Sequence, residues 1–331
     1  MTPPYFWQGG LDPRSRASAP LTRWLLTPLA ALYAAGAARR QRRARPARIA
    51  AQVICVGNLT LGGVGKTPIT AAIRDRLVAR GLRAASLSRG YGGRLRGPLR
   101  VRADHHRAGD VGDEPLLLAQ SGEAWIGRDR VLAARDMSLS GVQVVVMDDG
   151  HQNPTLAKDL SLVVLDTSDP VGNGHVFPKG PLREPLSAGL ARADAIVLMG
   201  EGPAPSLLDG FDGPILRAEL APTAQAPGGP LVAFAGIGRP QKVFDSLLAA
   251  GADLAESVPF PDHHPYRPGD LAYLQRLAAA RGARLITTEK DHVRLPPAIR
   301  PDVLTWPVKA VFQSPETLEA LLDRLLSGSA T

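Results

Sequence analysis

The feature that most constrains the fold is a glycine-rich segment at residues 56–68, which reads Val-Gly-Asn-Leu-Thr-Leu-Gly-Gly-Val-Gly-Lys-Thr-Pro. An apolar run at 53–56 precedes it, and a helix-like run at 69–80 follows. This order of strand, glycine loop, Lys-Thr and helix is the layout of a phosphate-binding loop. Its backbone N–H groups can surround an anion, and the helix N-terminus adds a partial positive charge. The segment therefore predicts an α/β protein that binds a nucleoside triphosphate.

We expect every residue from 58 to 67 to contribute to this nucleotide site. These residues are Asn58, Leu59, Thr60, Leu61, Gly62, Gly63, Val64, Gly65, Lys66 and Thr67. Lys66 can reach the outer phosphates, and the Thr67 hydroxyl can coordinate Mg²⁺. Thr60 stands where the strict motif has glycine, so a glycine-rich turn before an ordinary helix is the alternative. Pro68 favours the phosphate loop, because proline is tolerated in the first helical turn.

Strand-like apolar runs recur along the chain with helical patterns between them, which predicts a parallel sheet covered by helices. The runs lie at 52–56, 84–88, 142–147, 161–166, 194–199, 215–220, 231–236, 284–288 and 303–309. With 331 residues the chain is long enough for two domains. The stretch 201–230 is rich in Pro, Gly and Ala. We therefore expect an N-terminal segment over 1–48, a phosphate-loop domain over 49–220 and a smaller α/β domain over 221–331.

The charge of the chain predicts an anionic partner. The net charge is +8 and the isoelectric point is about 10.0. Such values are typical of proteins that bind a nucleic acid, a membrane surface or a phosphorylated substrate. The hydrophobic fraction of 44% is enough for well-packed cores. The single cysteine, Cys55, excludes an internal disulfide and cannot by itself form a cysteine metal site.

The N-terminal segment favours a membrane surface among these partners. Residues 24–38 carry no charge, and six arginines follow between 39 and 48. A membrane span needs roughly 20 apolar residues, so this stretch is short, and Pro28 interrupts it. An interfacial helix with its arginines on anionic lipid fits better. The alternatives are a core helix with a solvated basic end, or a nucleic-acid arm, for which no accompanying motif is present.

Acidic and histidine-bearing segments supply the remaining chemistry. Asp148 and Asp149 follow a buried strand, where an acid of a phosphate-loop protein holds Mg²⁺. Two adjacent carboxylates repel each other unless a cation is near, which favours a bound cation. The alternative is a turn that merely uses the sequence Asp-Asp-Gly. Asp113 and Glu114 precede Pro115 and could merely begin a helix. The loop at 262–264, Asp-His-His, could bind metal, act as a base or do neither.

Taken together, these segments resemble the tetraacyldisaccharide 4′-kinases, also called lipid A 4′-kinases, over about residues 20–295. The resemblance rests on the order of seven motifs rather than on any one of them, and Thr60 is the family's own form of the loop. The motifs are Gly57-Asn58 with Gly62-Gly63-Val64-Gly65-Lys66-Thr67-Pro68, Ser88-Arg89-Gly90-Tyr91-Gly92, Gly112-Asp113-Glu114-Pro115, Asp148-Asp149-Gly150, Gly180-Pro181-Leu182-Arg183-Glu184-Pro185, Asp262-His263 and Thr288-Glu289-Lys290-Asp291.

The resemblance implies a kinase that phosphorylates the 4′-hydroxyl of a tetraacylated glucosamine disaccharide 1-phosphate, using ATP and Mg²⁺. It further implies work at the cytoplasmic face of the bacterial inner membrane, by a monomer that binds no nucleic acid and has its active site between two α/β domains. Asp113 would be the base, paired with His263 and assisted by Lys66. Thr67, Asp148, Asp149 and Glu114 would surround Mg²⁺. The acceptor would contact Arg89, Tyr91, Arg128, Gln152, Arg183, Glu184 and Asp262.

Two other functions compete with this interpretation. GTPases and metallochaperone-type NTPases use a similar glycine loop, but the guanine-reading motif Asn-Lys-x-Asp is missing, because Glu289 precedes Lys290. A non-enzymatic membrane scaffold that only senses nucleotide would need no base. Substrate-stimulated turnover of ATP distinguishes a kinase from such a scaffold.

Overall fold

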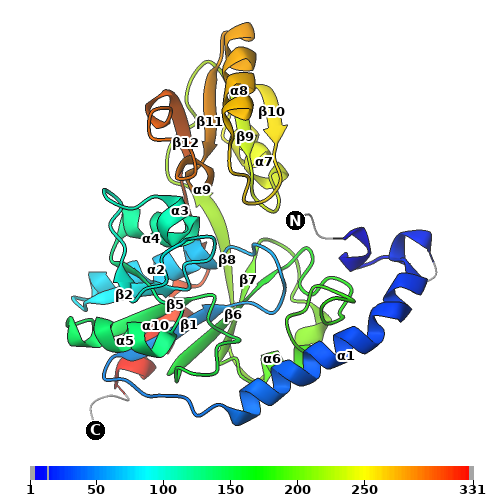
Figure 1. Ribbon diagram of the computed structural model, residues 1–331, viewed down its shortest axis with the longest axis vertical. Helices are drawn as coiled ribbons and strands as arrows, with labels where there is room; N and C mark the ends of the chain where they lie inside the picture. The colour runs from blue at the N-terminus through cyan, green and yellow to red at the C-terminus, as the bar shows by residue number, and fades with distance from the viewer. Residues whose placement is uncertain (1–3, 13–14, 328–331) are drawn as a thin grey trace.

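The computed structural model describes residues 4–12 and 15–327 as two α/β units, each built on its own sheet (Figure 1). Residues 1–3, 13–14 and 328–331 belong to the expected N-terminal and C-terminal segments and lie outside the described residues. The smaller unit stands above one edge of the larger sheet, and helix α1 runs along the side of the larger unit (Figure 1). A parallel sheet with a second, smaller α/β unit is thereby confirmed.

The larger sheet has nine strands in the order β13-β8-β7-β6-β1-β5-β2-β4-β3. All neighbours pair in parallel except β13 with β8 and β3 with β4. The strands are β1 (Gln52–Gly57), β2 (Ala84–Ser88), β3 (Leu99–Arg100), β4 (Ala124–Ile126), β5 (Val144–Asp148), β6 (Leu160–Asp166), β7 (Ala195–Met199), β8 (Ile215–Pro222) and β13 (Val308–Phe312).

Helices cover both faces of this sheet, which is why its central strands are apolar without alternation. Ile54 and Val56 of β1 pack toward α2 (Lys66–Ala79) and α10 (Pro315–Ser327). Val53 and Cys55 point to the opposite face and pack with α5 (Arg130–Leu139). Because successive strand residues face opposite sides, one short run fills two cores.

The smaller sheet has four parallel strands in the order β10-β9-β11-β12. These strands are β9 (Pro230–Ala235), β10 (Asp253–Pro259), β11 (Arg284–Thr288) and β12 (Val303–Trp306). Helices α7 (Gln241–Ala249) and α8 (Pro268–Ala280) pack against its opposite faces. Apart from α1, which is described below, the remaining α-helices of the described residues are the shorter α3 (Ala108–Val111), α4 (Asp113–Ser121), α6 (Leu186–Leu190) and α9 (Glu289–His292).

The C-terminal part of the chain does not stay in the smaller sheet. The apolar run at 303–309, expected as one strand, is divided at Pro307 into β12 and β13. Strand β12 pairs with β11, whereas β13 returns to pair with β8, and α10 packs on the larger core. Residues 308–327 therefore lie with the larger sheet, in contrast to their expected place in a domain over 221–331. Proline cannot donate a ladder hydrogen bond, which makes it a natural boundary between two strands.

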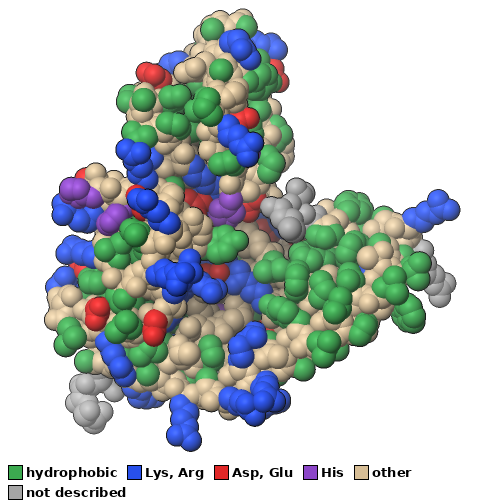
Figure 2. Space-filling view, in the orientation of Figure 1, with side chains coloured by type: hydrophobic (Ala, Val, Ile, Leu, Met, Phe, Trp, Pro, Cys, Tyr) green, Lys and Arg blue, Asp and Glu red, His purple; other side chains and the backbone are tan. Residues whose placement is uncertain are grey.

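Helix α1 (Pro20–Arg43) has a different surface from the other long helices. Its side chains at positions 21, 24, 25, 29 and 32, namely Leu21, Trp24, Leu25, Leu29 and Leu32, are each more than half exposed. Spacings of three and four residues place them along one stripe of the helix. Figure 2 shows this apolar surface at the lower right, with arginines toward the end of the helix. Among the described residues, no helix is long and apolar enough to cross a membrane.

Candidate active site between the two sheets

The glycine loop connects β1 to α2 in the expected way. Gly62 and Gly65 have φ angles of 124° and 86°, which strongly favour glycine, and Gly65 is the residue before the first turn of α2. Thr60 needs no such freedom, because its φ is not positive. It is buried and forms an antiparallel bridge with Leu182. Because its φ is not positive, this position accepts threonine in place of glycine.

Several hydrogen bonds hold the loop in place. The Asn58 side chain donates to the Thr60 carbonyl at 2.8 Å, and the Leu61 N–H donates to the Pro181 carbonyl at 2.8 Å. Arg183 donates through Nε to the Thr60 carbonyl at 3.0 Å. The loop that begins at residue 180 thus holds the first half of the phosphate loop through hydrogen bonds to residues 60 and 61.

Asp148 ends β5 beside the first turns of α2. The Thr67 hydroxyl donates to Asp148 Oδ2 at 3.0 Å, and the Thr70 hydroxyl donates to Oδ1 at 3.3 Å. Burial and the charge of Glu114 raise the pKa of Asp148 to about 7 against the opposing charge of Lys66. No ion pair among the described residues includes this carboxylate. A buried acid beside a threonine hydroxyl is a donor set that suits a hard cation such as Mg²⁺.

The neighbouring Asp149 is neutralised by the protein itself. Its Oδ1 lies 2.7 Å from Arg183 Nη1 and 3.5 Å from Lys66 Nζ. Burial alone would raise the pKa of Asp149, but the charges of Lys66 and Arg183 outweigh it and lower the pKa to about 2. Across the described part of the chain, no group of three or more His, Cys, Asp or Glu side chains could hold a metal. Mg²⁺ commonly needs only one or two carboxylates when it also binds phosphates.

Asp113 is the point where the two units meet. It is the first residue of α4 and only 7% exposed. His263 Nδ1 lies 3.0 Å from its Oδ2, and Arg294 donates to the same oxygen from Nε at 2.8 Å and from Nη2. Burial alone would raise the pKa of Asp113. The His263 hydrogen bond and the charges of Lys290 and Arg294 instead hold it well below its usual range.

The smaller unit holds these partners of Asp113 in a fixed arrangement. Arg294 also donates to the Gly236 carbonyl and to Asp291, both at 2.8 Å. Asp291 is fully buried and accepts a hydrogen bond from the Tyr266 hydroxyl at 2.8 Å. His263 adopts a positive φ of 60°, and its ring reaches Asp113 of the larger unit.

Two further ion-pair groups bridge the units on either side of this contact. Lys290 lies 3.1 Å from the Glu114 carboxylate. On the other side, the buried Asp166 at the end of β6 accepts from Arg239 at 2.8 Å and from Lys242 at 2.9 Å. Both cations belong to the smaller unit, at or just before the start of α7. The contact between the two units is therefore bordered by charged pairs.

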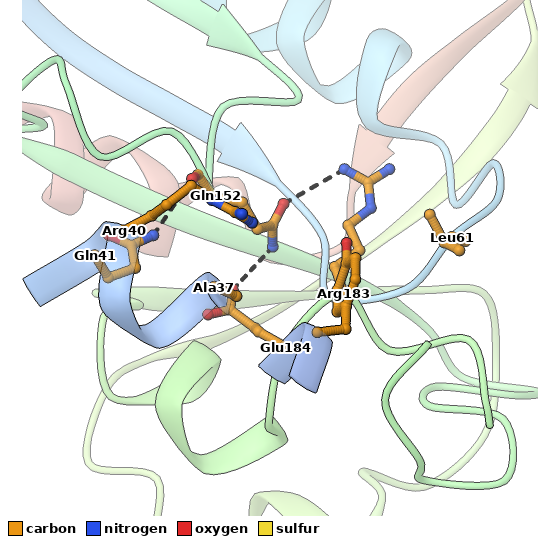
Figure 3. Close-up of a pocket in the computed structure, with 8 residues that line it drawn as sticks. Ala37, Arg40, Gln41, Leu61, Gln152, Arg183 and Glu184 are labelled. Atoms are coloured by element: carbon orange, nitrogen blue, oxygen red, sulfur yellow. Dashed lines mark hydrogen bonds between the residues drawn. The ribbon is translucent and has the colours of Figure 1, made fainter. Parts of the chain in front are cut away.

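A cavity of about 230 Å³ lies between α1 and the phosphate-loop side of the larger unit (Figure 3). Its lining residues come from α1 and from three segments of the larger unit: Tyr33, Ala37, Arg40 and Gln41, then Leu61, Gln152, Arg183 and Glu184. Gln152 donates to Glu184 at 3.0 Å and to the Asn58 carbonyl at 2.8 Å. Because Arg183 also contacts Asp149, the cavity adjoins the phosphate loop directly.

The structure brings most of the expected site residues together. Lys66, Thr67, Asp148 and Asp149 form one cluster, and Asp113 and His263 form the contact between the units. Gln152, Arg183 and Glu184 line the cavity. The other expected residues lie around these groups. Arg89, Arg128 and Tyr91 have exposed side chains, and the centroid of the Tyr91 ring is 6.3 Å from that of the His263 ring. Asp262 adjoins His263, and Glu114 forms an ion pair with Lys290.

Sequence reasoning did not identify Arg294, Lys290 or the four α1 residues of the cavity as site residues. Lys290 and Arg294 follow β11, and charged residues that follow a parallel strand are a usable signal for a site. The α1 residues Tyr33, Ala37, Arg40 and Gln41 carry no such signal, because only the packing of α1 brings them near the loop.

Comparison with known proteins agrees with this geometry. A family model described as tetraacyldisaccharide-1-P 4′-kinase matches residues 22–327. The tetraacyldisaccharide 4′-kinase of Hyphomonas neptunium is 59% identical over 322 residues, which cover 97% of each chain. That of Maricaulis maris is 52% identical over 331 residues, covering 97% of this chain and 96% of the relative.

A solved structure also matches the fold. The crystal structure of LpxK from Aquifex aeolicus in complex with ATP has a TM-score of 0.72 and 25% identity to this chain. The match covers 92% of this chain and 99% of that one. Since the family model spans both sheets and the relatives match nearly end to end, the chain belongs to the tetraacyldisaccharide 4′-kinase family.

Proposed function

We propose that this protein transfers the γ-phosphate of ATP to the 4′-hydroxyl of a tetraacylated glucosamine disaccharide 1-phosphate, as a step of lipid A synthesis. The observation that carries the proposal is the 3.0 Å hydrogen bond between His263 of the smaller unit and the buried Asp113 of the larger unit. Glu114, the neighbour of Asp113, is close enough to Asp148 for its charge to raise the pKa of that acid. The proposed base therefore lies near the donor site.

The donor side follows the general logic of phosphoryl transfer, in which positioning and charge neutralisation supply most of the rate. The loop amides and Lys66 would hold the phosphates of ATP. Thr67 and Asp148 would hold Mg²⁺. Asp149 would orient Lys66 and Arg183 through its ion pairs with them. The bound Mg²⁺ would supply neutralisation of the phosphate charge. Asp148 is the better ligand of the two acids, because Asp149 already has two protein cations.

On the acceptor side, Asp113 would take the proton of the attacking sugar hydroxyl, which typically contributes about 10²–10⁴-fold to the rate. His263 orients the carboxylate through the 3.0 Å hydrogen bond. The cavity beneath α1 is lined by Arg183, Glu184 and Gln152, whose polar groups suit the hydroxyls of a sugar. Arg89, Tyr91, Arg128 and Asp262 would border the acceptor from the cleft.

The exposed stripe of α1 would place this cavity against a membrane. Its leucines and Trp24 are apolar, and the following arginines at 39–48 would each gain about 1 kcal/mol near anionic lipid. We propose peripheral binding at the cytoplasmic face of the inner membrane, by a monomer.

Membrane binding can be tested without removing the cavity residues of α1. Leu25→Asp with Leu32→Asp should abolish co-sedimentation with vesicles that contain anionic lipid. Leu139→Asp is the control, since Leu139 is an 87% exposed leucine on α5, away from the stripe. If the α1 variant sediments as well as the control, α1 is not the membrane contact.

The kinase proposal is tested by incubating the protein with labelled ATP, Mg²⁺ and the tetraacyl disaccharide 1-phosphate. Transfer of label to the lipid is the expected result, and turnover of ATP should rise when the acceptor is added. A metallochaperone-type GTPase or ATPase, the alternative function, would hydrolyse nucleotide without labelling the lipid. Hydrolysis alone would overturn the proposal.

A further inference from the structure

Arg130 is a buried arginine that forms no ion pair among the described residues. It is the first residue of α5 and 4% exposed. Nη1 donates to the Gly127 carbonyl, while Nε is buried and has no hydrogen-bond partner in the described part of the chain. The adjacent Asp129 instead caps α5, where its Oδ1 accepts from the Val131 and Leu132 amides at 3.0 Å.

Arg74, a second buried arginine, has the partners that Arg130 lacks. Arg74 is 1% exposed, but its guanidinium is fully engaged. It donates to the Leu118 carbonyl at 2.7 Å, to Ser121 at 2.7 Å and to Asp75 at 3.0 Å. A buried charge normally requires such partners, since burial without them is strongly unfavourable. Arg130 is therefore not explained by a structural role alone.

The position of Arg130 points to the active site. Gly127, whose carbonyl accepts from Arg130, donates its own amide to the Ser88 carbonyl at 3.1 Å. Gly127 therefore lies at the end of β2. Leu87 is in register with Met147, which puts Ser88 level with Asp148 on the next strand. The Ser88 hydroxyl is also buried without a hydrogen-bond partner among the described residues.

The charges around Arg130 are those of the donor site. Burial and the nearby charge of Arg89 lower the pKa of Arg130 to about 10, against the opposing charges of Asp149 and Asp148. The same Asp149 lies 3.5 Å from Lys66, the lysine of the phosphate loop. Arg130 therefore lies near a like charge, that of Arg89, and near the same acids that adjoin Lys66.

We propose that Arg130, with Arg89 and the Ser88 hydroxyl, forms a subsite that binds a phosphate group at this edge of the larger sheet. A guanidinium offers five donors in a planar fork that matches phosphate oxygens, and a phosphate would satisfy the orphaned Nε and separate the two like charges. Under the proposed function, on which this inference rests, the phosphate has two sources. It is the terminal phosphate of ATP or the phosphate already present on the acceptor.

The ligand preferences of Arg130→Met test the subsite, because methionine keeps an unbranched apolar stem and removes the guanidinium charge. If the ligand is the terminal phosphate, the preference for Mg²⁺-ATP over Mg²⁺-ADP in calorimetric titration should fall about 10- to 100-fold, with the affinity for ADP unchanged. If the ligand is the acceptor's phosphate, the preference in KM for the acceptor over its dephosphorylated analogue should fall instead. Arg130→Lys should lose less in either case.

Arg135→Met is the matched control, because Arg135 is an exposed arginine on the same helix and should keep both preferences. Should Arg130→Met not fold, Arg130→Lys and Arg89→Met carry the same test, since Arg89 is exposed. The subsite is overturned if both preferences equal those of the unmodified protein in every folded variant. The ATP–ADP comparison needs no acceptor, so a failure of the kinase proposal would be seen separately in the labelling assay.

Discussion

Replacing Asp113 with asparagine isolates the charge of the proposed base from its shape. Asparagine keeps the size of the side chain and one acceptor oxygen for Arg294 and His263. It removes the carboxylate that four donor or cationic groups now face: His263 Nδ1 at 3.0 Å, Arg294 Nε at 2.8 Å, Arg294 Nη2, and Lys290 Nζ at 4.0 Å. The variant therefore tests both the chemistry and the contact between the units.

Two magnitudes follow from this geometry. Loss of the base should lower kcat by about 10²–10⁴-fold. Breaking a buried ion pair can cost about 3–5 kcal/mol, but Arg294 keeps Asp291 and the Gly236 carbonyl at 2.8 Å. We therefore expect the free energy of unfolding to fall by only about 1–3 kcal/mol. A domain with a typical stability of about 5–15 kcal/mol stays folded.

The assay measures kcat at saturating ATP and acceptor together with unfolding in urea. Asp291→Asn is the matched control, because Asp291 is fully buried and pairs with the other side of Arg294, away from the cleft. It should lose similar stability while keeping kcat within a few-fold. The reasoning is refuted if Asp113→Asn keeps kcat within tenfold, or if Asp291→Asn lowers kcat as far as Asp113→Asn does.

Three further predictions concern separate parts of the molecule. The pKa of Asp166 is lowered because the hydrogen bond from Ser168 and the contacts of Lys242 and Arg239 outweigh burial. The stabilisation that Asp166 contributes is therefore fully present above its ordinary pKa of 3.8, and it is lost as the pH falls through the lowered pKa. Asp166→Asn should thus lower the free energy of unfolding near neutral pH and make it depend less on pH in acid. Urea unfolding at several pH values measures this, and an unchanged dependence on pH in acid would contradict it. Gly57→Ala should lower the free energy of unfolding by about 1–3 kcal/mol, because its Cβ would lie 2.4 Å from the Cβ of His151, and an unaltered melting temperature would argue against that packing. Lys66→Ala should abolish ATP turnover with the circular dichroism spectrum intact, and normal turnover would exclude the lysine from phosphate handling.

Much of the larger sheet and half of the site were predictable from local patterns. The glycine loop, its helix and the acid after β5 are recognisable because phosphate binding needs those residue types at fixed spacing within a short segment. The buried strands are recognisable as apolar runs, since helices cover both faces of the sheet. Strand β10 has no such run, because it lies at the edge of the smaller sheet and most of its residues are only partly buried, and it was missed. The three-residue β4 was missed as well.

By itself, the sequence determined that this chain has a phosphate loop, parallel sheets and a basic, partly apolar N-terminal helix. It paired Asp113 with His263 only through a family resemblance, because the two residues are 150 positions apart and no local pattern links them. The tertiary structure alone decided that Arg294 and Lys290 join that pair, that α1 closes a cavity beside Arg183, and that Pro307 sends the chain back to the larger sheet. The physical reason is that local spacing fixes a loop or a strand, whereas a cleft depends on which distant segments the topology brings together.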